Sequence, residues 1–239
     1  MTRRTPLTPI FDPDIRRGGI SVGNTPGTAV GTILDLAWLY QDWRGLGGTP
    51  AGWTSVGDTP NYVADGVTTA ASASAEVVRL TAGVPPSSDA GTIMIQTAGN
   101  APSSENANAW GILWAPDETG PYVVAFWASN DVSAFYSDAL NSYAVTGTDA
   151  IDTADNLHVA AVRWNVATGD LHLDSWNDDT LSANDSTTES LLSVTDQTAQ
   201  ILIGDVAGLG VVAISHSAWW DFVLSDAQMA EVVALWTPV

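Results

Sequence analysis

Acidic and imidazole side chains alternate with leucines in the segment GDLHLDSW, residues 169–176. In an extended strand this spacing places Asp170, His172, Asp174 and Trp176 on one face and the two leucines on the other. Retaining glycoside hydrolysis needs two carboxyl groups about 5–5.5 Å apart, which makes this chemistry the first candidate. A strand whose polar face is turned to solvent explains the same pattern more simply, and we favour that interpretation.

Oxygen-bearing side chains gather in the next segment, WNDDTLSANDS. Carboxylate and amide oxygens are the ligands that Ca²⁺ prefers, but their spacing here is not that of an EF-hand. A solvated turn rich in Asp and Asn is the commoner explanation. We predict a loop over 177–185, and its candidate cation ligands, with calcium as the cofactor, are Asn177, Asp178, Asp179 and Asp185.

Eleven tryptophans are a large number for a chain of 239 residues. An indole ring offers a broad apolar face on which a sugar ring can stack, although burial in the core is the usual position of a tryptophan. Four of the eleven flank predicted loops or strand ends, so we take them as candidate carbohydrate-binding residues: Trp53, Trp110, Trp114 and Trp176.

The residues of other catalytic sites are absent or scattered. His158, His172 and His216 lie in three separate segments, without a metal-binding pair on one element. The chain has no cysteine, which excludes disulfides, thiolate metal sites and cysteine nucleophiles. It also has no G-x-S-x-G nucleophile elbow. We therefore predict no catalytic residue and no enzyme activity.

Charge divides the chain into two parts. The net charge is −20, and all seven basic residues are arginines. Four of these and two aspartates give residues 1–19 a charge of +2, so the remaining 220 residues carry −22. Residues 20–239, with this negative charge, repel nucleic acid and anionic lipid, so we expect neither as a partner. No run of about 18 apolar residues predicts a transmembrane helix, so we expect no membrane insertion.

Residues 1–31 are rich in Thr, Pro, Gly and Arg and have no hydrophobic period. Such a segment cannot form a core of its own, so we predict an extended N-terminal arm that docks on a partner. It also lacks the apolar stretch of a secretory signal peptide, so we do not expect secretion by that route. The residues best suited to docking are Arg3, Arg4, Phe11, Arg16 and Arg17.

From about residue 61 onward, short apolar segments alternate with Gly-, Pro-, Asn- and Asp-rich turns, which indicates a β-sandwich or barrel. Residues 33–40 fit a strand and a helix equally well. Residues 44–60 have the composition of a loop. Near the end, Ser225 and Gln228 form a capping box that predicts a helix. Its apolar stripe is Met229, Val232, Val233 and Trp236.

Three segments in the last third of the chain resemble the laminin-G-like family: NLHVAAVRWNVATGDLHLDSW (156–176), ILIGDVAGLG (201–210) and DFVLSDAQMAEVVALW (221–236). The resemblance implies an all-β fold, a two-sheet antiparallel jelly-roll sandwich of the concanavalin A-like type with one short C-terminal helix. The arm would then precede a single domain over 32–239. The resemblance also implies a structural role for His158 and a loop calcium. Jelly-roll hydrolases carry an E-x-D-x-x-E pattern, which this sequence lacks.

The family includes lectins, adhesion modules and virion proteins, so fold alone does not give the function. Our leading hypothesis is a virion structural protein of a bacteriophage, either a capsid decoration or spike protein or a tail-fibre component, which contacts host glycans. Its partners would be other virion proteins or further copies of itself, held through the arm, and it would lie on the particle surface. The alternative is an extracellular bacterial carbohydrate-binding lectin.

Overall fold

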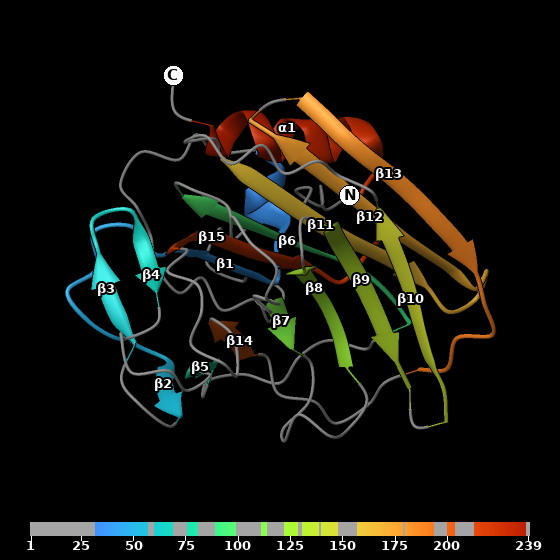
Figure 1. Ribbon diagram of the computed structural model, residues 1–239, viewed down its shortest axis with the longest axis horizontal. Coiled ribbons are helices and arrows are strands. Elements are labelled where there is room, and N and C mark those ends of the chain that lie inside the picture. Colours follow the sequence, from blue (N-terminus) through green and yellow to red (C-terminus); the bar gives the residue numbers. More distant parts are fainter. Residues whose placement is uncertain are drawn as a thin grey trace, which may run out of the picture.

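Two strands that are apolar on both faces, β11 (His158–Asn165) and β15 (Ala213–Trp220), run through the middle of the molecule (Figure 1). Their side chains are almost all buried, as expected for central strands covered on both sides. The computed structural model describes residues 32–56, 60–68, 76–80, 89–98, 111–113, 122–128, 131–138, 140–147, 157–178, 180–193, 200–203 and 213–237.

Six further strands join these two in an eight-stranded sheet: β1 (Leu39–Asp42), β3 (Asn61–Val63), β4 (Gly66–Thr68), β6 (Ala90–Ala98), β12 (Asp170–Asn177) and β13 (Thr180–Thr188). The order across this large sheet is β13-β12-β11-β6-β15-β4-β3, and β1 also pairs with β15. Every pairing is antiparallel. Neighbours in the chain, such as β11 and β12, are joined as hairpins.

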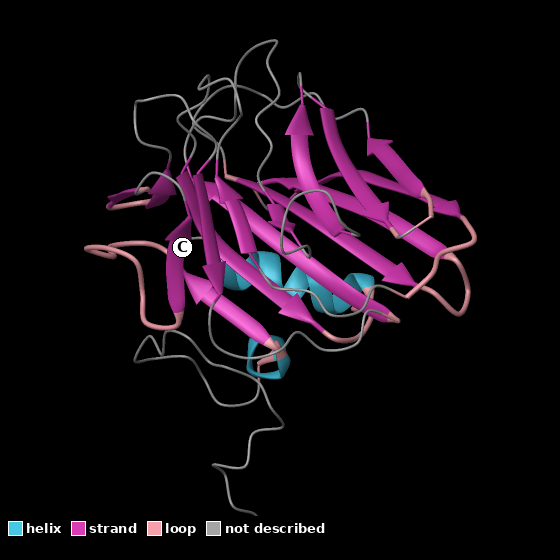
Figure 2. Cartoon of the chain, turned by 90° about the horizontal axis from the view of Figure 1, so that it is seen from below, coloured by secondary structure: helices cyan, strands magenta, loops and turns pink. Residues whose placement is uncertain are grey.

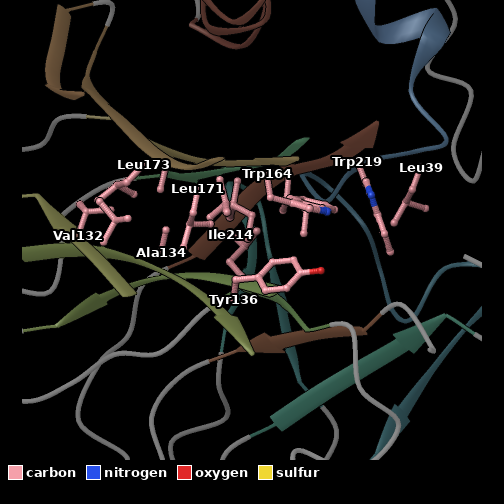
Figure 3. Packing of buried hydrophobic residues seen from close by; sticks show 14 of the residues in the cluster. Leu39, Val132, Ala134, Tyr136, Trp164, Leu171, Leu173, Ile214 and Trp219 are labelled. Carbon is pink, nitrogen blue, oxygen red and sulfur yellow. The ribbon is translucent and has the colours of Figure 1, made fainter. Parts of the chain in front are cut away.

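Two smaller antiparallel sheets cover one face of the large sheet. The first has the order β10-β9-β8 and the second the order β2-β5-β14-β7. Described side chains of β2, β9 and β10 meet those of the large sheet in one hydrophobic cluster, the inner core, part of which is drawn in Figure 3. The bounds of the strands in the two smaller sheets are β8 (Tyr122–Ala128), β9 (Asp131–Ser137), β10 (Ser142–Gly147), β2 (Trp53–Val56), β5 (Glu76–Leu80), β14 (Gln200–Ile203) and β7 (Gly111–Leu113).

The other face of the large sheet is covered by two helical segments, the short 3₁₀ helix η1 (Ile33–Leu36) and α1 (Asp226–Trp236) (Figure 2). The predicted capping box is present, because the Ser225 hydroxyl accepts from the Gln228 backbone N–H while the Gln228 side chain accepts from the Ser225 N–H. The predicted apolar stripe of α1 is buried against the sheet, which confirms both expectations.

Three segments differ from the expectations. Residues 33–40, which fit a strand and a helix equally well, contain the 3₁₀ helix η1 and then the start of strand β1. The expected loop over 44–60 includes β2, whose residues pair with β5. The expected loop over 177–185 is a tight hairpin, because Asn177 pairs with Thr180 and β13 continues to Thr188. β13 is polar and lies at the sheet edge, so it lacks the hydrophobic alternation that reveals a half-buried strand.

Candidate functional site

The two predicted sugar-stacking tryptophans that the structure describes do not lie at a surface. Trp53 is 6% exposed and packs edge-on against Trp43 in the inner core. Trp176 is 5% exposed and belongs to the cluster beneath α1. A buried indole has no face left for a ligand, so the prediction is wrong for these two residues. Trp110 and Trp114 lie outside the described residues.

The predicted cation ligands are not gathered in one loop. Asn177 ends β12, and Asp178 occupies the hairpin turn with φ 54°, a left-handed conformation that Asp tolerates. The Asp178 carboxylate accepts a hydrogen bond from the Leu157 N–H at 3.1 Å, so it fixes the turn to the start of β11. Asp185 lies well along β13, opposite Leu173. Asp179 lies outside the described residues. Within the described ranges, no three His, Asp or Glu side chains form a group suited to a metal ion.

The arm residues Arg3, Arg4, Phe11, Arg16 and Arg17 also lie outside the described part of the chain. The docking prediction for them therefore stays a prediction.

The expected polar face of β12 is partly buried instead of solvated. Asp174 is 0% exposed because α1 and β13 cover this end of the sheet. Its two carboxylate oxygens accept hydrogen bonds from Nε and Nη2 of Arg163 at 2.9 and 3.0 Å, and Asn184 donates a third. Arg163 also donates through Nη1 to the Leu224 carbonyl and to Asp226 at the start of α1. Arg163 thus links Asp174 to the start of α1, and the buried Asp174 carboxylate is not available to a substrate.

A second buried polar group surrounds His216. A β-bulge at this point of β15 turns Ser215 and His216 toward the same partner, Gln96 on β6. His216 Nδ1 lies 2.7 Å from Gln96 Oε1 and 3.2 Å from Ser215 Oγ, and its Nε2 lies 3.8 Å from Asp42 Oδ2. Serine, histidine and aspartate are therefore neighbours, as in a hydrolytic triad.

Ser215 and His216 have a structural role, because both are buried and hydrogen-bonded to Gln96. Ser215 and His216 are each 1% exposed, and the Ser215 hydroxyl is within hydrogen-bond distance of two Gln96 oxygens. Burial lowers the pKa of His216 to about 3, although Asp42 opposes the effect. The imidazole stacks with the rings of Trp236 and Tyr40, at centroid distances of 5.2 and 6.3 Å. No substrate reaches a serine in this position.

A third group of polar residues lies on the β10-β9-β8 sheet, on the side that faces away from the inner core. Along β9, Val132, Ala134 and Tyr136 point into the inner core, as Figure 3 shows. The alternate residues of β9 therefore face the other side of the sheet, where Ser133 and Ser137 are buried, at 5% and 8% exposed, and Phe135 is half-buried. They pair with outward residues of β10 in three rungs, and we call this surface the hydroxyl–phenyl face: Ser133–Thr146, Phe135–Ala144 and Ser137–Ser142.

Both outer rungs are hydrogen-bonded pairs of hydroxyls, at 3.0 Å for Ser133–Thr146 and 2.9 Å for Ser137–Ser142. The half-buried Phe135 ring lies between them, opposite the small Ala144. On β10 all three residues of the face are exposed. An aromatic ring bordered by hydroxyls offers an apolar surface together with hydrogen-bond donors and acceptors, which is the combination found in small-molecule sites.

A buried carboxylate and two tyrosines fix this sheet to the neighbouring chain segment. Asp138, after β9, accepts hydrogen bonds from the N–H groups of Leu140, Asn141 and Leu192. The Tyr136 hydroxyl donates to the Leu192 carbonyl at 2.7 Å, and the Tyr143 hydroxyl donates to the Ser190 carbonyl at 3.1 Å. These bonds hold the β9–β10 turn and thereby set the positions of the three rungs.

Comparison with solved structures identifies the architecture. The receptor binding domain of botulinum neurotoxin mosaic serotype C/D superposes with a TM-score of 0.59 at 10% identity, over 86% of this chain and 52% of that chain. The botulinum neurotoxin serotype G binding domain gives 0.58 at 13% identity, over 83% and 51%. The VIP36 exoplasmic/lumenal domain, solved in a Ca²⁺/Man-bound form, gives 0.55 at 13% identity, over 77% and 89%.

This chain has a lectin-like jelly-roll fold. The jelly-roll sandwich with one short C-terminal helix, predicted from the sequence, is therefore confirmed. The chain spans about half the length of the two toxin domains. No family model matches the sequence. A comparison with curated proteins finds no match either. Among the described helices, none has the length and apolar character needed to cross a membrane.

Proposed function

We propose that this chain binds carbohydrate through its jelly roll and does not hydrolyse it. The observation that carries the proposal is the hydroxyl–phenyl face, where an aromatic ring lies between two hydroxyl pairs whose β10 members, Ser142 and Thr146, are exposed. Such a surface suits sugars, because their C–H faces pack on aromatic rings while their hydroxyls exchange hydrogen bonds with Ser and Thr. The likeness to a mannose-bound lumenal domain agrees with this function.

The test of binding is a screen of the full chain against immobilised oligosaccharides, with Phe135→Ala as the decisive variant. Removing a ring that a ligand buries costs about 1.5–3 kcal/mol, so we expect affinity to fall about tenfold or more. Phe222→Ala is the matched control, because Phe222 is also half-buried but packs on the α1 side of the molecule. Equal binding by the wild type and Phe135→Ala would contradict the proposed site.

The absence of hydrolysis is tested by reducing-sugar release from a panel of glucans and galactans. We expect none, because Asp174 is held by Arg163 and because Ser215 and His216 are buried. Release that is abolished by Asp174→Ala would overturn this part of the proposal.

We further propose that the domain is a structural protein of a bacteriophage virion, a capsid decoration or spike protein or a tail-fibre component on the particle surface. The supporting observation is the opposite charge of the two parts of the chain, +2 for residues 1–19 against −22 for the remainder, together with the prolines of the arm. An extended basic arm can dock on an acidic neighbour, either another virion protein or a further copy of this chain. An extracellular bacterial lectin is the alternative.

A truncation that begins at Thr28 tests the docking role. We expect the shortened chain to fold with an unchanged unfolding midpoint and to lose attachment to its particle. Attachment that survives the truncation would contradict the role of the arm, and a lowered midpoint would show that the arm belongs to the folded domain.

A further inference from the structure

The geometry of the hydroxyl–phenyl face defines the class of its ligand, and the inference rests on the proposed carbohydrate binding. We infer that the face takes a neutral, linear oligosaccharide that lies along β9 and β10, stacks one sugar ring on Phe135 and meets a hydroxyl pair on either side. Four observations lead to this ligand: the length of the face, the bonding capacity left in its hydroxyl pairs, the absence of a described cation from it and the small residue beside the ring.

The length of the face indicates an oligosaccharide. The two hydroxyl pairs are four residues apart on β9, because Ser133 and Ser137 lie on either side of Phe135. At about 3.4 Å per residue they are about 13–14 Å apart. One pyranose ring on Phe135 does not extend to both pairs, whereas a chain of several sugars that follows the strands does.

The hydroxyl pairs have capacity left for a ligand. Within each pair, one hydroxyl donates to the other, and either atom can be the donor. Each pair therefore keeps one O–H donor and several lone pairs for further bonds, and a ligand reaches the pair through its exposed β10 member, Thr146 or Ser142. Sugar hydroxyls also donate and accept, so they match groups that can act in both ways.

The charge of the protein favours a neutral ligand. The chain contains no lysine, and its net charge is −20. Of the arginines whose side chains the structure describes, Arg44 is paired with Asp42 on β1 and Arg163 with Asp174 in the large sheet. Neither belongs to the hydroxyl–phenyl face, and the acidic body repels a carboxylate or sulfate. No described cation on the hydroxyl–phenyl face is therefore available to pair with a sialylated or sulfated sugar.

Ala144 leaves space beside the ring. It is exposed and lies directly opposite Phe135, where paired side chains are about 4.5–5.5 Å apart. A large side chain at this position would occupy the place of a stacked sugar.

The experiment compares neutral oligosaccharides of increasing length with their sialylated counterparts, using calorimetry on the full chain. We expect affinity to rise from the monosaccharide to the length that spans both hydroxyl pairs and then to level off. We also expect the sialylated forms to bind at least about tenfold more weakly. Equal or tighter binding of the sialylated forms, or no gain with length, would overturn the inference while leaving carbohydrate binding intact.

Two variants locate the ligand on the face. Ala144→Tyr should block the space beside Phe135 and lower affinity about tenfold or more, whereas the control Ala144→Ser should bind as the wild type does. Thr146→Val removes a hydroxyl from one end of the face and should weaken long oligosaccharides but not short ones. Full binding by Ala144→Tyr, with an unchanged unfolding midpoint, would place the ligand elsewhere. If no sugar binds to any variant or to the wild type, the proposed function itself fails.

Discussion

Replacing Arg163 by leucine should lower the free energy of unfolding by about 3–5 kcal/mol, the usual cost of breaking a buried ion pair. Asp174 is 0% exposed, and Arg163 binds both of its oxygens, so the variant leaves a buried carboxylate with Asn184 as its remaining described donor. The variant also loses the bond from Arg163 to the Leu224 carbonyl before α1. Urea denaturation, followed by tryptophan fluorescence, measures the loss.

The same variant should show a characteristic dependence on pH. Burial raises the pKa of Asp174, while Arg163 opposes the rise. Without Arg163, the folded-state pKa moves further above the unfolded value of about 3.9. Between the two values the folded state holds a proton that the unfolded state releases, so stability falls as pH rises through this interval. The deficit of Arg163→Leu relative to the wild type should therefore be largest near neutral pH and shrink on acidification.

Two controls separate the buried pair from its surroundings. Asp226→Asn removes the other carboxylate that Arg163 contacts, but this side chain is 80% exposed, so the loss should stay below about 1 kcal/mol. Arg163→Leu combined with Asp174→Leu removes both charges and should recover most of the stability. A loss below about 1 kcal/mol for Arg163→Leu at neutral pH, or a deficit that grows on acidification, would refute the reasoning.

Three further expectations concern α1 and the histidine beneath it. Trp236→Ala should lower the free energy of unfolding by about 3–5 kcal/mol, because the ring is buried against His216, whereas Leu235→Ala, at a position 47% exposed, should cost far less in the same denaturation assay. Ser225→Ala removes the helix cap and should cost about 1 kcal/mol by the same measurement. The pKa of His216, followed by NMR, should lie near 3, below its ordinary value of 6.5, and the unfolded chain then binds the proton first. Stability should therefore decrease as pH falls from 6.5 toward 3, and His216→Phe should weaken that decrease.

The sequence predicts a feature correctly where the residues that determine it lie close together in the chain. The α1 helix was predictable because its cap and apolar stripe lie within twelve residues, Ser225 to Trp236. Trp176 was wrongly expected at the surface, because the helix that buries it lies about fifty residues further along the chain. The face that β9 forms with β10 depends on a pairing register that the sequence does not state.

The first and last helical segments of the described chain are joined on one side of the sandwich. The Ile33 N–H donates to Glu231 of α1, and Trp220 donates to the Ile33 carbonyl. Thr32, where the described chain starts, therefore lies on the α1 side of the large sheet, and the hydroxyl–phenyl face belongs to the opposite layer. If the domain is tethered close to Thr32, β9 and β10 lie on the side away from the support. Immobilising the chain through an N-terminal tag should thus present these strands to a ligand in solution.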